Sequence, residues 1–455
     1  MSSDRTPFLN VWSVLLLIDS ADCRTTSQYW QLKPTPKYST KAVARCVPPS
    51  ATVRRAKRLI ERVGVTQVAE VTGLDSVGIP NFMTVRPRDL GPGISYYNGK
   101  GTTRQDALAG ALMEAVERQA GEHCDYAVTY ASEAELAGTT PLTKLAEIVV
   151  PNACAFDDQT PVEWVHGYDL IGQRATAVPL NAVVCPYTPT DVPALFYAST
   201  NGLASGNTLT EALCHALCEV IERDALAISL ARSQVTPAIG GLLESIGISS
   251  SPSAHQNADH AQIRLEGLPR RAALLVGRLK RAGLNIYVRN LTSTAGLATI
   301  DCTIVEPTAS GIPNAHGGCG THPDARIALN RAITEAAQSR IACIQGGRED
   351  LPEIIKPRAP YDADELYGGT EFIDFDDVPS VQNASIDDDI RLILDRMPDY
   401  GLDQAVAFDL TRPEVGMPVV RVVVPKAEAW SVFHLHTGRG VFGERVSQVL
   451  QGAMQ

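Results

Sequence analysis

The sequence predicts an α/β (α+β) fold in which a strand–glycine loop–helix unit recurs within one composite domain. The prediction rests first on an internal repeat: residues 101–118 (GTTRQDALAGALMEAVER) align without gaps with residues 206–223 (GNTLTEALCHALCEVIER). Residues 328–340 (ALNRAITEAAQSR) form a third, more divergent copy. Secondly, an apolar run and then a glycine-containing segment precede each copy. Thirdly, Ala, Leu, Val and Ile recur at helical spacing within the copies, which indicates three equivalent helices.

Each unit should begin with a strand and continue through a loop that contains Asn and Gly. The expected strands are residues 94–97, 194–198 and 302–305. The expected loops are residues 98–101, 201–206 and 314–320. Glycine lets a backbone approach a ligand closely, and the free N–H groups at a helix start attract phosphate. The unit is therefore typical of a nucleotide site, although the Walker A spacing GxxxxGK[ST] is absent.

Polar residues recur at two fixed positions in the three helices. These positions hold Glu114 and Glu117, Glu219 and Glu222, and Glu335 and Gln338. Two Glu residues three apart share a helix face, and Arg118 and Arg223 can each pair with the Glu four residues earlier. The rest of each helix is apolar, so this face should point inward, where carboxylates repel one another and lose hydration unless cations lie between them.

Mg²⁺ takes carboxylate oxygens together with nucleotide phosphates, so the repeated acids predict a Mg–ATP site. A solvated helix face is the alternative interpretation, because Glu–Arg pairs are common on such faces. The recurrence of the whole helical frame argues against that alternative.

Four stretches together resemble the YcaO family, whose members are ATP-dependent enzymes that activate peptide backbone amides. The stretches are residues 72–80 (TGLDSVGIP), 96–118, 199–225 and 318–340. The resemblance extends from about residue 65 to about residue 425. It implies a YcaO-type fold around one nucleotide site, with ATP and Mg²⁺ as cofactors.

The resemblance also implies the residues of that site and assigns no catalytic residue. The implied Mg²⁺ ligands are Glu114, Glu117, Glu219, Glu222 and Glu335. The implied nucleotide contacts are the same acids with Lys100, Arg118, Arg223, Arg331 and Gln338. Gly110 stands where the family pattern has Ser, which removes one hydroxyl contact. Relatives supply a further basic residue from near the N-terminus, for which Lys41, Arg45 and Arg54 are candidates, and Glu428 is a weak additional candidate.

In the implied reaction, a nucleophile adds to the backbone carbonyl and the γ-phosphoryl group of ATP is transferred to the resulting oxyanion. A Cys or Ser side chain would give an azoline, an amine an amidine, and sulfide a thioamide. The chain lacks the Pro-rich tail of azoline-forming members, and residues 64–87 resemble the branch that works with a TfuA partner. We therefore expect thioamide formation in a ribosomally synthesised peptide or protein, with a TfuA-like partner and a sulfide source. The alternatives are an azoline cyclodehydratase, an amidine-forming enzyme and a non-catalytic ATP- or peptide-binding accessory protein in sulfur transfer.

Composition agrees with a cytoplasmic enzyme that binds neither nucleic acid nor membrane. The 455 residues are 44% hydrophobic and carry a formal net charge of −11, which disfavours nucleic acid. The apolar run at residues 11–18 is too short to cross a bilayer. We expect an N-terminal extension and lead-in segment at 1–60, a YcaO domain at 61–455, mobile loops near 248–260 and 348–389, and a homodimer, as in relatives.

A few further positions leave alternatives open. Cys214 and Cys218 lie one helical turn apart. They are interpreted either as half of a metal site or as small buried thiols. Cys319, in the third expected loop, is a nucleophile, a sulfur carrier or a small loop residue. His316 and His322 flank that loop as proton carriers or as packing residues. A helix is expected to start near Ser50, and closing strands are expected at residues 405–409 and 418–425.

Overall fold

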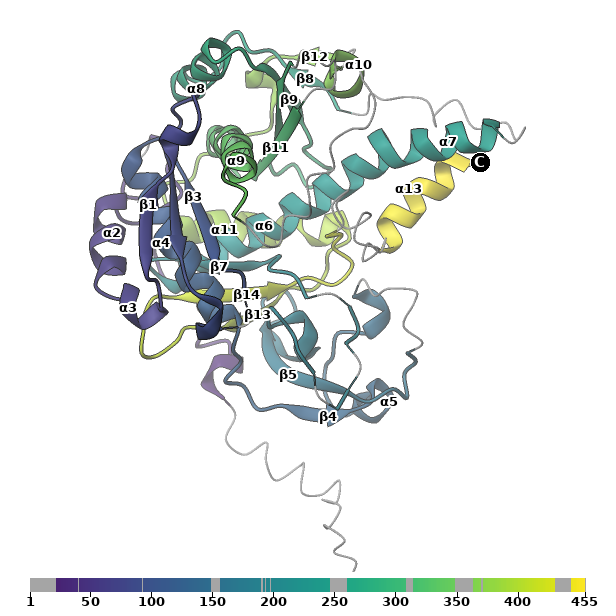
Figure 1. The fold of residues 1–455 in the computed structure, drawn as a ribbon. Coiled ribbons are helices and arrows are strands. Elements are labelled where there is room, and N and C mark those ends of the chain that lie inside the picture. Colours follow the sequence, from purple (N-terminus) through teal and green to yellow (C-terminus); the bar gives the residue numbers. More distant parts are fainter. Residues whose placement is uncertain are drawn as a thin grey trace, which may run out of the picture.

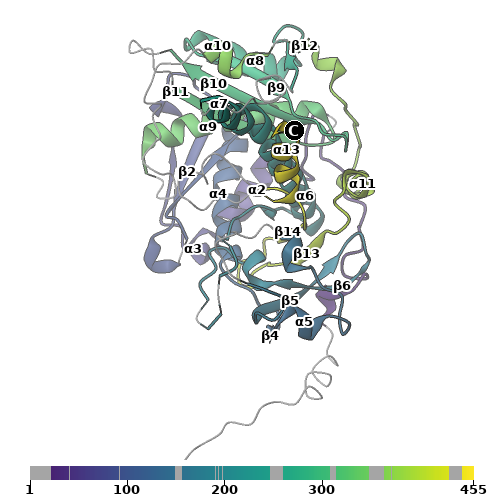
Figure 2. The ribbon, with the colours of Figure 1, turned by 90° about the vertical axis from the view of Figure 1, so that its right-hand side faces the viewer.

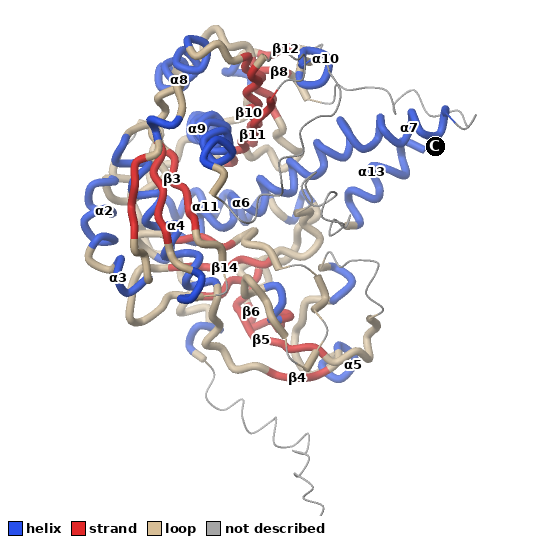
Figure 3. The backbone as a smooth tube through the Cα atoms, in the orientation of Figure 1, coloured by secondary structure: helices blue, strands red, loops and turns tan. Residues whose placement is uncertain are grey.

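The computed structural model combines helices with three β-sheets (Figures 1 and 3). It describes residues 22–39, 41–91, 93–148, 156–189, 191–192, 194–196, 198–245, 260–307, 314–347, 363–369, 371–429 and 443–454. The expected mixed α and β architecture is confirmed. The apolar run at 11–18 lies outside the described residues, and within them no helix has the length and apolar character needed to span a membrane.

Strands in the three sheets are mostly antiparallel. The first sheet has the order β1 (Gln67–Glu70), β2 (Asn81–Val85), β3 (Tyr96–Lys100). The second has the order β11 (Asn314–Thr321), β10 (Thr299–Glu306), β9 (Asn285–Asn290), β8 (Gln262–Ile263), β12 (Phe372–Ile373), with β8 and β12 parallel. The third has the order β4 (Thr129–Ala131), β5 (Val162–Asp169), β13 (Val406–Asp409), β14 (Val419–Val423), β7 (Leu203–Ser205), and β6 (Arg174–Pro179) pairs with β5. Strands β13 and β14 confirm the two predicted closing strands.

The three repeats form the helices α4 (Arg104–Gly121), α6 (Leu209–Leu230) and α9 (Ala325–Gln345). The Thr that recurs in the first two repeats caps its helix: Thr103 Oγ1 accepts a hydrogen bond from the Asp106 N–H at 3.2 Å, and Thr208 Oγ1 from the Glu211 N–H at 3.1 Å. The recurring Gly is needed because a Cβ on Gly206 would lie 2.5 Å from the Ala212 backbone nitrogen. The repeat is thus a structural unit.

The three units close into a ring. Helix α4 packs against β3 and against β7 of the next unit, α6 against β7 and β11, and α9 against β11 and back against β3. At equivalent positions in the three helices, Ala107, Ala212 and Ala328 are completely buried. Small side chains there allow the helices to lie close to the strands, as β3 and β11 lie beside α9 in Figure 1.

The expected boundary between strand and glycine loop is wrong in all three units. Residues 98–100 lie within β3, and Gly317–Gly320 lie within β11. In the second unit, residues 194–196 form no strand, and β7 follows the turn at Gly202. The physical reason is helix packing: a Cβ on Gly99 would lie 1.9 Å from the Ala111 nitrogen, so glycine keeps the strand against its own helix.

The remaining helices surround this ring. They are α2 (Pro49–Lys57), α3 (Ile60–Val63), α5 (Glu133–Leu136), α7 (Thr236–Ser245), α8 (Arg270–Arg281), α10 (Ala363–Tyr367), α11 (Ile386–Arg396) and α13 (Glu444–Met454). A π-helical turn, Ala231–Val235, joins α6 to α7, and α13 lies beside them (Figures 1 and 2). Helix α2 begins at Pro49, in agreement with the predicted start near Ser50.

The second half of the segment 348–389, which was expected to be a mobile loop, contains regular secondary structure. Residues 348–362 lie outside the described part, but the segment continues through α10, β12 and the start of α11. Its acids are not all solvated, because Asp389 is fully buried and its Oδ2 lies 2.6 Å from the Lys37 ammonium. Of the other expected loop, 248–260, only His260 is described. The division into a segment 1–60 and a domain 61–455 stays a prediction.

Candidate active site

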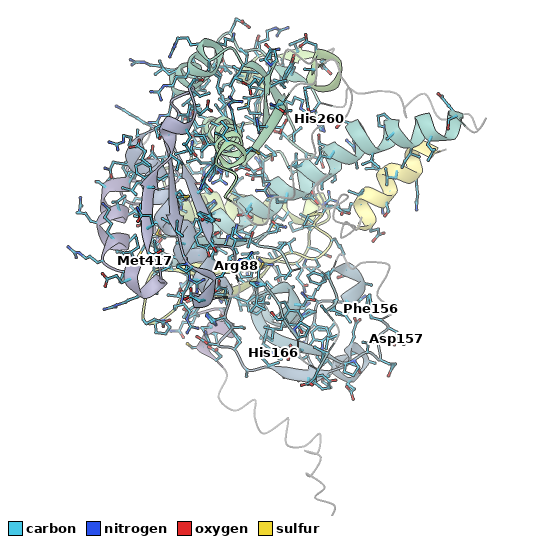
Figure 4. The ribbon with its side chains drawn as sticks, viewed as in Figure 1. Arg88, Phe156, Asp157, His166, His260 and Met417 are labelled. Atoms are coloured by element: carbon cyan, nitrogen blue, oxygen red, sulfur yellow. The ribbon has the colours of Figure 1, made fainter. Side chains whose placement is uncertain are left out.

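A cavity of about 1270 Å³ lies where the three repeat helices meet. All ten candidate site residues line it: Lys100, Glu114, Glu117, Arg118, Glu219, Glu222, Arg223, Arg331, Glu335 and Gln338. Arg88, labelled in Figure 4, also lies on its wall. The structure therefore brings together side chains that are more than 230 residues apart in the sequence.

On α4, the two acids have different surroundings. Glu114 Oε1 accepts a hydrogen bond from Arg118 Nε at 2.9 Å, which confirms the predicted pair one helical turn apart. Glu117 is buried and accepts a hydrogen bond from the Ser205 backbone N–H at 2.9 Å. Burial, reinforced by the charges of Glu114 and Glu219, raises the pKa of Glu117 well above its usual value. This carboxylate therefore lacks sufficient positive charge nearby.

On α6, the arginine pairs differently from the prediction. Arg223 Nη2 lies 3.6 Å from Glu222 Oε1 and 3.6 Å from Glu335 Oε1, and it forms no such pair with Glu219. The cause is the approach of α9, whose Glu335 attracts the guanidinium group across the cavity. Within the described part of the chain Glu219 has no ion pair, and burial, with Glu222 and Glu114 nearby, raises its pKa to about 7.

On α9, the acid is well compensated. Lys100 Nζ lies 2.5 Å from Glu335 Oε2. Burial would raise the pKa of Glu335, but Lys100, Arg223 and Arg331 outweigh it and lower that pKa to about 2. Arg331 Nη2 also lies 3.7 Å from Glu222 Oε2. Glu335 is therefore ionised over the whole physiological pH range.

The second polar position of each repeat joins its helix to the next unit. Glu117 accepts the Ser205 N–H on β7, and Glu222 accepts the Thr321 N–H on β11 at 3.0 Å. In the third unit Gln338 Nε2 donates to the Asn98 carbonyl on β3 at 2.6 Å. A carboxylate can only accept, so the partner at β3, which is a carbonyl, explains the amide at this position.

The acids that remain undercompensated fit a divalent cation. Glu222 is completely buried, and its Oε1 has no hydrogen-bond partner among the described residues. Glu117 and Glu219 have raised pKa values, first because they are desolvated and then because acids surround them. Hard oxygen donors without enough positive charge are a donor set suited to Mg²⁺. Glu117, Glu219 and Glu222 are therefore the residues that would hold it.

A family model described as YcaO cyclodehydratase, which binds ATP and Mg²⁺, matches residues 98–428, and this span includes strands β4 to β14 and all three repeat helices. The chain belongs to the YcaO family. ATP and Mg²⁺, the cofactors expected from the sequence, are those of the family.

Several proteins are similar to this YcaO chain. An uncharacterized protein of Methanothermobacter thermautotrophicus is 33% identical over 87% of this chain and 98% of its own length. An uncharacterized protein in the tfuA 3′ region of Rhizobium leguminosarum bv. trifolii is 31% identical over 84% of this chain and 88% of its own. The structure of YcaO from Methanopyrus kandleri bound with AMPPCP and Mg²⁺ matches with a TM-score of 0.66 at 24% identity, covering 90% of this chain and 98% of that one. That likeness shows the shared fold.

Two cavity residues of this YcaO protein, Glu211 and His215, were not candidates from the sequence, and a third, Arg45, was one of three N-terminal candidates left open. Among the three N-terminal candidates, Arg45 lines the cavity and Lys41 and Arg54 do not. Arg45 Nη1 lies 3.1 Å from Glu211 Oε1, and the buried Glu211 also accepts the Cys46 N–H at 3.0 Å. A signal for Glu211 exists, because it occupies the place of Asp106 in the repeat; the contact with Arg45 spans 166 residues and leaves no local pattern.

Glu428 does not line the cavity. It is completely buried and accepts the backbone N–H groups of Gly443 and Val446, each at 2.9 Å. These are the groups at the start of α13, where a carboxylate is stabilised by the helix. Glu428 therefore anchors the C-terminal helix, and the weak expectation of a site role is not supported by its position.

Cys214 and Cys218 are buried, as the simpler interpretation predicts. The ligand atoms of Cys214, His322 and Asp389 lie within 4.8 Å of one another. Asp389 is already paired with Lys37, however, and His322 Nδ1 accepts the Asp324 N–H at 2.9 Å, which leaves the proton on Nε2. This cluster is therefore organised as a buried ion pair.

The third expected loop is a strand, which changes the interpretation of its residues. Cys319 lies in β11 with 1% of its surface exposed, and burial raises the pKa of its thiol well above the usual value. A neutral, enclosed thiol is a poor nucleophile. Burial and Arg340 lower the pKa of His316 to about 4, so this imidazole is neutral at pH 7. Both residues therefore behave as packing residues of β11.

Proposed function

We propose that this YcaO protein uses Mg–ATP to phosphorylate a backbone amide oxygen of a ribosomally synthesised peptide or protein and so forms a thioamide, with a TfuA-like partner and a sulfide source. The observation that carries the proposal is the convergence of the repeated acids and their Lys and Arg partners on one cavity. Its volume of about 1270 Å³ exceeds the roughly 1,000 Å³ of large small-molecule sites, which leaves room for a peptide segment beside a nucleotide.

The proposed reaction balances in three steps. Hydrosulfide adds to the carbonyl carbon, which forms a C–S bond and an oxyanion, and its proton passes through solvent to the phosphate that finally leaves as HPO₄²⁻. The oxyanion attacks the γ-phosphorus of ATP, and the bond to ADP breaks. The C–O bond then breaks, phosphate leaves with the former amide oxygen, and the thioamide remains.

The cavity supplies charges for the phosphoryl-transfer step. Lys100, Arg223 and Arg331 place positive groups around Glu335 and Glu222, where they can neutralise charge on the transferring phosphoryl group. When bound by Glu117, Glu219 and Glu222, Mg²⁺ would share that charge. The amide oxygen is a poor leaving group until it is phosphorylated, so the reaction needs this environment.

Thioamide formation is supported by one relative and by one stretch of sequence. The Rhizobium relative is named for its position in the tfuA 3′ region, and residues 64–87 resemble the TfuA-associated branch. Azoline formation is the second candidate, because the family model is described as a cyclodehydratase. Both reactions use the same ATP-dependent activation and differ in the nucleophile.

Mass spectrometry separates these candidates. A peptide encoded beside this protein's gene would be incubated with the protein, Mg–ATP, sulfide and the neighbouring TfuA-like protein. Replacement of oxygen by sulfur adds about 16 Da, whereas cyclodehydration removes about 18 Da. The proposal predicts the gain, and it requires both ATP and sulfide. Loss of about 18 Da would assign the protein as a cyclodehydratase, and an unchanged peptide with no ADP formed would contradict amide activation altogether.

A further inference from the structure

His215 lies on the cavity wall between two arginines. It projects from α6, and Arg331 Nη1 on α9 lies 2.9 Å from its Nε2. On the other side of the His215 imidazole, Arg45 Nη2 lies 3.4 Å from Nδ1. All three side chains line the cavity. An imidazole with a guanidinium group at each nitrogen is an unusual arrangement, because guanidinium groups only donate hydrogen bonds.

The imidazole is neutral at physiological pH. Burial first, and then the charges of Arg331, Arg45 and Lys100, lower the pKa of His215 well below its usual value. His322 also faces it, while Glu211 lies one turn earlier on α6 and is occupied by Arg45 and by the Cys46 N–H. No carboxylate forms an ion pair with His215 among the described residues.

A neutral imidazole has one acceptor nitrogen and one N–H. The shorter contact, 2.9 Å to Arg331, identifies Nε2 as the acceptor, so the proton is on Nδ1. The Nδ1–H then faces an N–H group of Arg45. Both groups are donors, so they cannot form a hydrogen bond with each other. Arg331 Nε also has no acceptor among the described residues. Glu211 and Glu222 pair with the two arginines, but among the described residues neither carboxylate accepts from the His215 Nδ1–H.

We propose that a phosphoryl oxygen of the ATP triphosphate binds between the Nδ1–H of His215 and the guanidinium group of Arg45, so that His215 is a nucleotide-binding residue. This inference rests on the proposed function, because it assigns a contact within the same nucleotide site. Arg331 holds the imidazole of His215 through Nε2, and the imidazole presents its one N–H to the anion. A hydrogen bond to a charged oxygen is stronger than one to a neutral acceptor.

Two substitutions separate the two ring nitrogens. His215→Asn places an amide N–H near the position of Nδ1, whereas His215→Gln reaches the position of Nε2 and loses the N–H beside Arg45. Affinities for AMPPNP with Mg²⁺ and for adenosine would be measured by calorimetry on the full chain. We expect His215→Gln to weaken AMPPNP binding about tenfold or more, which corresponds to one hydrogen bond to a charged group. His215→Asn should stay within about threefold of the unsubstituted protein, and adenosine affinity should not change.

The outcomes distinguish this inference from the function on which it rests. Equal AMPPNP affinity in the unsubstituted protein and both variants would overturn the role of His215 and leave the nucleotide site intact. Equal losses in both variants, extending to adenosine, would assign His215 a structural role and also overturn the inference. Failure of the unsubstituted protein to bind AMPPNP would instead overturn the proposed function.

Discussion

The charge state of individual acids decides how the cavity can work. Glu335 is held ionised by Lys100, Arg223 and Arg331, whereas at Glu219 burial is reinforced by the charges of Glu222 and Glu114 and is opposed only in part by Arg223 and Arg331. Two residues with the same side chain therefore have pKa values of about 2 and about 7. Environment, rather than residue type, separates a permanent anion from a group that titrates near neutrality.

This difference predicts how Mg²⁺ affinity depends on pH. With a pKa of about 7, Glu219 holds a proton at pH 6 and has lost it at pH 8, and Mg²⁺ binds the ionised form. Affinity should therefore fall on going down from pH 8 to pH 6, by up to about tenfold per pH unit below pH 7 for one displaced proton. Calorimetry with Mg²⁺ and AMPPNP would measure it.

Glu219→Gln is the matched control, because it removes the titrating group with little change of shape. The dependence between pH 6 and pH 8 should become shallower in this variant, with the remaining slope arising from Glu117, whose pKa is also raised. If Mg²⁺ affinity had the same pH dependence in the unsubstituted protein and in Glu219→Gln, the proton displaced by Mg²⁺ would not come from Glu219.

At the scale of elements, glycines hold each strand against its helix. A Cβ on Gly318 would lie 2.2 Å from the Ala336 nitrogen of α9, while a Cβ on the adjacent Gly317 would meet no atom within 4 Å. We expect Gly318→Ala to destabilise the protein by about 1–3 kcal/mol through overpacking, and Gly317→Ala to stay within about 0.5 kcal/mol of the unsubstituted protein. Urea unfolding measures both, and equal midpoints for the two variants would contradict this packing argument.

Another contact between elements joins the N-terminal segment to α11. Lys37 Nζ lies 2.6 Å from Asp389 Oδ2, with 6% and 0% of the two side chains exposed. The Thr35 N–H also donates to Asp387 Oδ1 at 2.7 Å. These contacts hold the segment that carries Arg45 to the cavity.

Breaking the buried ion pair should unfold this part of the structure readily. Lys37→Met leaves the Asp389 carboxylate buried without a cation and should lower the free energy of unfolding by about 3–5 kcal/mol. The double variant Lys37→Met, Asp389→Leu should recover much of that loss, because it removes both charges. Thermal unfolding tests this, and a double variant no more stable than the single one would contradict the assignment.

The sequence predicts the elements better than their boundaries. Helices α4, α6 and α9 follow from apolar periodicity and a repeated frame, and β13 and β14 from short apolar runs. The glycines of β3 and β11 were misassigned to loops because glycine in a strand and glycine in a loop look alike until the helix that crosses the strand is known.

The candidate site shows the same limit. The repeated acids reach one cavity as predicted, because their positions are fixed by helical periodicity. His215 was not singled out, and Arg45 was not separated from Lys41 and Arg54, since the contacts of His215 with Arg45 and Arg331 join three distant segments and leave no local spacing to recognise. Likewise, the stretch that contains Asp389 is rich in acids, which is typical of a solvated segment. The buried partner of Asp389, Lys37, is more than 350 residues away in the sequence.

At the scale of the whole molecule, ring closure explains why the acids recur. Each repeat helix contacts the strand of the next unit, and Glu117, Glu222 and Gln338 make the connecting hydrogen bonds to the backbone. A carboxylate with one oxygen held by the neighbouring strand has its other oxygen fixed in direction. The ring thus preorganises the acids around the cavity, which is what electrostatic stabilisation of phosphoryl transfer requires.

The most direct test of this account is calorimetric titration of AMPPNP, with and without Mg²⁺, into the unsubstituted protein and the variants Glu117→Gln and Glu222→Gln. Gln keeps an oxygen that can accept a hydrogen bond from the Ser205 or Thr321 N–H. The contacts between the repeat units should therefore remain while the negative charge is lost. Glu70→Gln, an acid outside the cavity lining, is the control. The account predicts Mg²⁺-dependent binding that weakens at least about tenfold in the two cavity variants and is unchanged in the control. Unchanged affinity in Glu117→Gln and Glu222→Gln would contradict it.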